Sequence, residues 1–89
     1  MAAQVYDQNN KILFEFNMNS EIEQSFNELF KHTGVYIDVY GDTRLYKNHS
    51  QILINFLDKK GNALMKMTKE FRENLFLSLQ NEILYIIGD

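Results

Sequence analysis

The two histidines are the first side chains to consider for metal binding. His32 falls at the end of a predicted helix and His49 in a predicted loop, and neither has another histidine or a carboxylate at a spacing that fixes metal geometry. His32 is better explained as a cation near a helix C-terminus, where the macrodipole favours positive charge. We therefore predict neither a metal site nor any other cofactor.

Hydroxyl nucleophiles are the next candidates. The chain has no cysteine and no glycine-rich phosphate loop, which excludes a thiol nucleophile and nucleotide binding of the P-loop or dinucleotide type. No serine stands in a nucleophile-elbow pattern, although a triad of a serine with His49 and Asp38 stays open as a small enzyme of unknown reaction. We predict no catalysis, because so short a chain seldom holds a water-excluding pocket beside its core. The serines are Ser20, Ser25, Ser50 and Ser78.

A basic cluster in the second half of the chain is a candidate for binding nucleic acid or another phosphate. Phosphate binding by this cluster would be stronger if Thr68 began a helix whose N-terminus faced the phosphates. The sequence pI of about 5.3 argues against nucleic acid, so we rank this function below protein binding. The cluster consists of Lys59, Lys60, Lys66, Lys69 and Arg72.

A run of tyrosines and charges is the preferred candidate binding surface. Tyrosine and arginine dominate binding hot spots, because they bury a large area and keep a polar group. The alternative is that a helix or the N-terminal hairpin covers these side chains and makes them core. The candidate residues are Tyr36, Asp38, Tyr40, Asp42, Arg44 and Tyr46.

Charge is unevenly distributed along the chain. Residues 1–44 carry seven acids against three bases, whereas residues 45–89 carry five acids against six bases. An acidic half attracts a basic partner. We expect a small protein-binding module, such as an inhibitor or a toxin-neutralising (immunity-type) partner of a basic protein. A homodimer that pairs a sheet edge or the segment 83–87 is compatible with this function.

Length and composition predict one domain over residues 1–89. The 45% hydrophobic content is enough for a core, and no segment approaches the length of a membrane span. With no cysteine and no secretory leader pattern, we expect a cytoplasmic protein without a membrane partner.

The first half predicts a hairpin, a helix and a strand. Polar residues 7–10 form a turn after residues 4–6, and the alternating residues 11–16 place Ile12, Phe14 and Phe16 on one face. Ser20 and Glu23 form a capping box for a helix over 20–33 that ends at Gly34. Residues 35–40 alternate as a strand with Val35, Ile37 and Val39 inward, and 43–47 pair back in one of two registers. One places Leu45 inward and Arg44 outward and the other reverses them, and the cost of burying Arg44 favours the first.

The second half predicts a third hairpin and a second helix. Residues 50–57 are apolar on nearly both faces, as in a central strand, and 63–68 return after the turn 58–62. Thr68 begins a helix with apolar residues every fourth position from Phe71. Residues 83–87 are either its last turn or a closing strand, and their β-branched content favours the strand.

Together these elements predict an α+β fold with a largely antiparallel sheet of about four to six strands. Two amphipathic helices pack on one face of this sheet, in the order ββ-α-ββββ-α-(β).

Overall fold

The N-terminal hairpin forms around the polar turn 7–10, as the sequence predicts. In the computed structural model, which describes residues 2–88, β1 (Ala2–Tyr6) pairs antiparallel with β2 (Ile12–Asn17). The Asp7 carboxylate closes the turn by accepting two backbone N–H groups at 2.8 and 2.9 Å. Such a side-chain bond to the backbone is the usual reason that aspartate favours turns.

The first helix, α1 (Ser20–Thr33), has the predicted bounds but a different cap. Asn19, rather than Ser20, is the N-cap, and its Oδ1 accepts the N–H of Ile22 at 2.9 Å. At the other end Gly34 adopts the left-handed conformation, with φ of 76°, and donates its N–H to the carbonyl of Phe30. The prediction that Gly34 ends this helix is therefore confirmed.

Residues 35–40 do not form the predicted strand. Their backbone joins no ladder, although Ile37 is buried while Tyr36 and Tyr40 are each 70% exposed. The expected alternation of inward and outward side chains is thus present without the expected pairing. The neighbour of β3 (Asp42–Tyr46) is instead β4 (Ile83–Gly88), from the end of the chain.

The predicted strand over 50–57 is wrong, because this segment lies in helix α2 (Lys47–Asp58). Its buried residues Ser50, Leu53, Ile54 and Leu57 follow helical spacing. Ile52 and Phe56 are also apolar because α2 lies between α1 and α3, and they pack on its flanks.

The predicted return strand over 63–68 is also wrong. A short 3₁₀ turn, Gly61–Ala63, leads into helix α3 (Lys66–Leu77), which a second 3₁₀ turn, Ser78–Gln80, extends. Met65 and Met67 are about half exposed at the beginning of α3. The helical interpretation of 83–87 is excluded, because these residues form β4.

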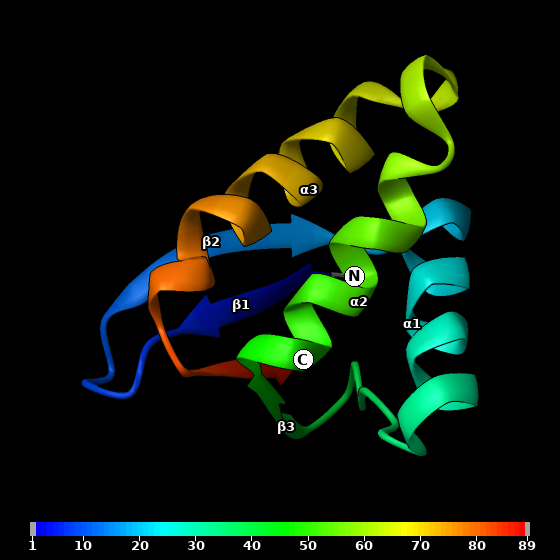
Figure 1. The fold of residues 1–89 in the computed structure, drawn as a ribbon. Coiled ribbons are helices and arrows are strands. Elements are labelled where there is room, and N and C mark those ends of the chain that lie inside the picture. Colours follow the sequence, from blue (N-terminus) through cyan, green and yellow to red (C-terminus); the bar gives the residue numbers. More distant parts are fainter. Residues whose placement is uncertain (1, 89) are drawn as a thin grey trace.

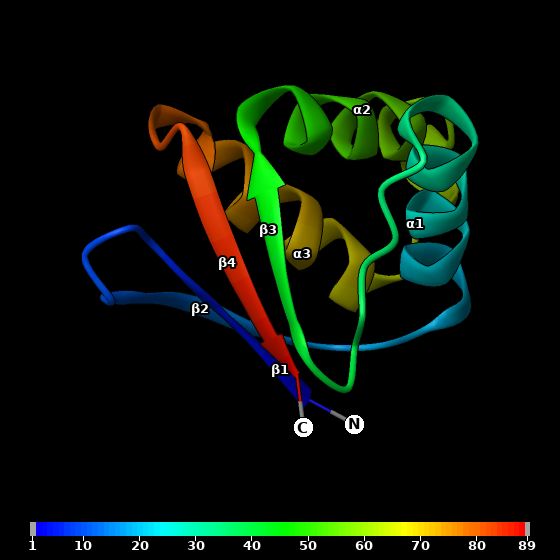
Figure 2. The ribbon, with the colours of Figure 1, turned by 90° about the horizontal axis from the view of Figure 1, so that it is seen from below.

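The observed order is ββ-α-β-α-α-β, with one antiparallel sheet in the strand order β2-β1-β4-β3. Within residues 2–88, the α+β class and the antiparallel sheet are confirmed. The four strands fall within the predicted four to six, but three α-helices replace the predicted two and the order of elements differs. All three helices lie on one side of the sheet (Figure 1). The opposite face carries no helix, as the view from below shows (Figure 2).

The core between the two layers includes a cluster of four phenylalanines. Phe71 of α3 lies 4.8 Å from Phe16 and 6.2 Å from both Phe14 and Phe26, measured between ring centroids. Ile12 was predicted to share their face, but it lies beyond a shift in the β1–β2 register and is 49% exposed. The cluster joins β2, α1 and α3.

Candidate functional site

The six residues of the predicted binding surface lie on two different surfaces. Tyr36, Asp38 and Tyr40 belong to the segment between α1 and β3, whereas Asp42, Arg44 and Tyr46 lie along β3. This segment runs beside β3, between it and α1 (Figure 2). The predicted surface is therefore divided, and its role in binding stays a prediction.

Tyr36 and Tyr40 line a groove against α1, which we call the α1–loop groove. Its volume is about 340 Å³. Phe26 and Ile37 are buried beneath it, at 7% and 4% exposure, while both tyrosines remain 70% exposed. The groove thus combines an apolar floor with two aromatic walls. Its lining is Met18, Glu23, Phe26, Asn27, Tyr36, Ile37, Val39 and Tyr40.

Asp38 holds the segment in place. Its carboxylate accepts the N–H of Tyr40 at 2.9 Å, and its own N–H donates to the Thr43 hydroxyl at 2.9 Å. Gly88 allows the close approach, since a Cβ there would overlap the carbonyl of Val39. These contacts give Asp38 a structural role, and they fix the backbone that carries both tyrosines.

The second surface is the sheet face without helices, which we call the open sheet face. Leu45 is buried against the helices, as predicted, so Asp42, Arg44 and Tyr46 point to the opposite side. The pairing register places Arg44 beside Tyr85, and Tyr85 beside Tyr6. The residues of this face include Gln4, Tyr6, Ile12, Glu15, Asp42, Arg44, Tyr46, Ile83, Tyr85 and Ile87.

Sequence reasoning missed the contributions of β1 and β4 to this face. Once 83–87 is taken as a strand, its alternation places Leu84 and Ile86 inward and Tyr85 and Ile87 outward. The sequence therefore contained enough information to place Tyr85 and Ile87 on the outward face. Tyr6 belongs to the predicted hairpin, but nothing in the sequence shows that β1 lies next to β4.

The basic cluster is partly neutralised by acids. Arg72 forms two hydrogen bonds with Asp58, at 2.9 and 3.2 Å, and lies 5.0 Å from the ring of Phe76. Lys60 lies over the ring of Phe56 at 5.3 Å. Arg72 is thus already engaged with a carboxylate, while phosphate binding by the cluster stays a prediction.

Thr68 does not cap α3, contrary to the prediction. The N-cap is Met65, and the Glu21 carboxylate of α1 accepts its N–H at 3.0 Å. Hydrogen bonds from Thr68 and Met65 hold the pKa of Glu21 below its usual value. Thr68 is buried, and its hydroxyl accepts a bond from Asn19. The Glu21 carboxylate therefore lies at the helix end where an orientation towards phosphates would have supported phosphate binding.

The histidines have structural partners. His49 Nδ1 accepts the N–H of Tyr46 at 3.2 Å, and burial lowers the pKa of this imidazole. His32 lies 2.9 Å from Glu28 and lowers the pKa of that carboxyl group. Among the hydrogen bonds of residues 2–88, none joins His49 to a serine or to Asp38.

The described part of the chain shows neither a cluster of metal ligands nor a helix that could span a membrane. Within residues 2–88, no group of three or more acidic or histidine side chains is arranged to hold a metal ion. Over the same residues, no helix has both the length and the apolar character needed to cross a membrane.

No protein-family model, curated protein or solved structure matches this chain.

Proposed function

We propose that this protein is a non-catalytic protein-binding module that engages a basic protein through the α1–loop groove. The observation that carries the proposal is the pair Tyr36 and Tyr40, each 70% exposed over the buried side chains of Phe26 and Ile37. Exposed tyrosines beside an apolar floor offer a partner a large contact area at a low entropic cost. A core role would have buried these rings.

The charge around the groove supports a basic partner. Glu23 lines the groove, and it has no partner among the ion pairs of residues 2–88. It stands with Glu21 in the first turn of α1, and the half of the chain that builds the groove carries the excess of acids. Complementary charge speeds the encounter and favours one sign of partner. Inhibition of a basic protein, such as a toxin, is the narrower form of the proposal.

The proposal is tested by affinity capture from the native host, with the wild-type chain and a Tyr36→Ala/Tyr40→Ala variant used in parallel. The captured protein is identified by mass spectrometry, and its affinity is then measured by calorimetry. We expect the variant to bind at least ~10-fold more weakly, as hot-spot residues do. Phe76→Ala on α3 is the matched control, since this ring is 48% exposed and lies outside the groove. Equal binding by both variants would contradict the role of the groove.

The basic nature of the partner needs its own measurement. Glu23→Lys should weaken binding, and the wild-type affinity should fall as salt rises, because added ions screen surface charges. A captured partner that is acidic, or whose affinity does not change with Glu23→Lys, would overturn this part of the proposal.

A further inference from the structure

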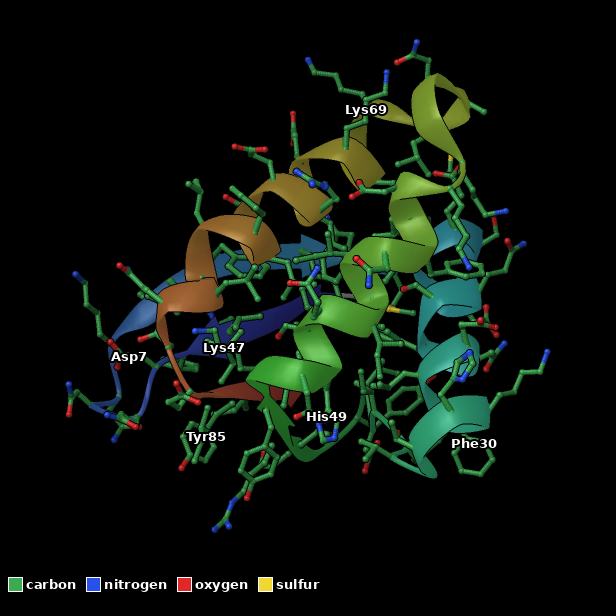
Figure 3. The ribbon with its side chains drawn as sticks, viewed as in Figure 1. Asp7, Phe30, Lys47, His49, Lys69 and Tyr85 are labelled. Carbon is green, nitrogen blue, oxygen red and sulfur yellow. The ribbon has the colours of Figure 1, made fainter. Side chains whose placement is uncertain are left out.

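The open sheet face is a second unpartnered surface, separate from the α1–loop groove. The Tyr85 side chain projects from β4 away from the helices (Figure 3), and Ile87 on the same strand is 38% exposed. On the other side of the sheet, the neighbouring residues Leu84 and Ile86 are almost fully buried. One sheet face is thus covered, while the other presents aromatic and aliphatic side chains to solvent.

Charge at one edge of this face indicates which partner would cover it. Asp42 and Arg44 are two residues apart on the edge strand β3, so their side chains share the open face. Both are exposed, and neither takes part in the ion pairs of residues 2–88. An unpaired acid and an unpaired base at this spacing attract a second such pair that lies opposite them in the reverse order, so that each acid faces a base. A second copy, turned by a twofold rotation, presents that order.

We infer that the open sheet face is the contact between two copies of this chain, with Asp42 of each copy facing Arg44 of the other. The residues lie in two rows across the sheet: Asp42, Ile87 and Gln4 form one, and Arg44, Tyr85 and Tyr6 form the other. A twofold axis between the rows, parallel to the sheet and perpendicular to its strands, places each row over the other row of the second copy.

This arrangement satisfies the side chains along both rows. Each Asp42 meets an Arg44, and each Ile87 meets a Tyr85, so the ion pair and the apolar contact both form twice. Packed sheets lie about 10 Å apart, a separation that a long arginine and a short aspartate can span together. The strands of the two sheets stay nearly aligned, as in common sheet-on-sheet packing.

The dimer differs from pairing through a sheet edge. The segment 83–87, expected above as a pairing edge, is a central strand with β1 on one side and β3 on the other. The open face spans four strands of five to six residues, about 19 by 17 Å from standard strand spacings. This is roughly 320 Å² of sheet on each copy, less than most specific interfaces bury, so we expect a weak and reversible dimer with a dissociation constant of roughly 10–100 µM.

Charge reversal and its repair provide the test. The dissociation constant is measured by analytical ultracentrifugation for the wild type, Asp42→Arg, Arg44→Asp and the double exchange. Each single reversal places like charges opposite each other and should weaken the dimer by at least ~10-fold. The double exchange restores opposite charges and should return the constant to within about threefold of the wild type. An equimolar mixture of the two single variants should form a heterodimer.

Matched controls separate this proposal from other effects. Glu70→Arg on α3 makes the same change in net charge as Asp42→Arg away from the face, so it should leave the constant unchanged, as should Tyr36→Ala in the groove. The test of the dimer is therefore independent of the binding function proposed for the α1–loop groove. A wild-type chain that stays monomeric up to about 1 mM overturns the dimer. So does a double exchange that stays monomeric while circular dichroism shows the native fold, or an Asp42→Arg variant that dimerises normally.

Discussion

Replacement of Phe71 by alanine is the sharpest test of how the helices pack on the sheet. Phe71 is 3% exposed, and its ring contacts three other phenylalanine rings, from two strand positions and from α1. The substitution removes the side chain through which α3 contacts both β2 and α1. It leaves a cavity that the surrounding rings, held on different elements, cannot fully close.

The expected loss in the free energy of unfolding is about 3–5 kcal/mol, from lost transfer energy and the cavity together. An 89-residue domain has a total stability of roughly 4–13 kcal/mol, so the variant should lose a large part of it. Urea denaturation followed by circular dichroism measures the change. With a slope of about 1–1.5 kcal/mol per molar urea, the midpoint should fall by at least ~2 M.

Two controls make the result interpretable. Phe76→Ala changes the same residue type on the same helix, but this ring is 48% exposed, so the loss should stay below about 1 kcal/mol. Phe71→Leu keeps most of the volume and should cost about 1–1.5 kcal/mol. Equal losses for Phe71→Ala and Phe76→Ala would refute the orientation of α3 described above.

Three further predictions concern caps and close contacts. Asn19→Ala should cost about 1–2 kcal/mol of stability in urea denaturation, because the first turn of α1 loses its acceptor and the Thr68 hydroxyl loses its donor, while Asn19→Asp keeps only the acceptor and should restore part of the loss. Burial lowers the pKa of His49 below 6.5, so its contribution to stability is complete above that pH and is lost as the pH falls through 6.5 towards the folded-state pKa. His49→Gln keeps an acceptor for the N–H of Tyr46 and should reduce the fall in Tm between about pH 7.5 and pH 5.5; an unchanged fall would contradict this. Gly88→Ala should cost about 1–3 kcal/mol, because the new methyl overlaps the carbonyl of Val39, and thermal unfolding with no loss would contradict that approach.

The elements predicted correctly are those whose signals are local. The turn at Asp7 forms with side-chain bonds to neighbouring backbone groups, and α1 is bounded by residues next to it in sequence. The cap was placed one residue too late, because Ser20 and Asn19 are both good N-cap residues and only the backbone conformation decides between them.

The largest error has a physical reason in the position of α2. A helix with one buried face shows a single apolar stripe, but α2 packs against α1, α3 and β3. Ile52 and Phe56 are therefore apolar as well, and the run resembles a strand covered on both sides. The spacing of the apolar residues could not distinguish a helix from a covered strand, since the short run over 50–57 is apolar in either structure.

The exposure of the candidate tyrosines agrees with the sequence, but their arrangement in space was not predicted. Tyr36, Tyr40 and Tyr46 are all exposed, as expected of binding residues. Their division between two surfaces depends on β4 pairing with β3, a contact between segments far apart in the sequence. No local pattern specifies which strand supplies that neighbour, so the open sheet face could not be assembled from sequence.

The place of β4 in the sheet has a consequence for the order of folding. It is the last strand in the chain, yet it lies between β1 and β3, which have no direct pairing with each other. As the chain leaves the ribosome, the hairpin and the helices can form early, while the sheet remains in two separate parts. Only the arrival of Ile83–Gly88 joins them, so the sheet cannot close until this strand has been synthesised, and unpaired strand edges stay open to other chains until then.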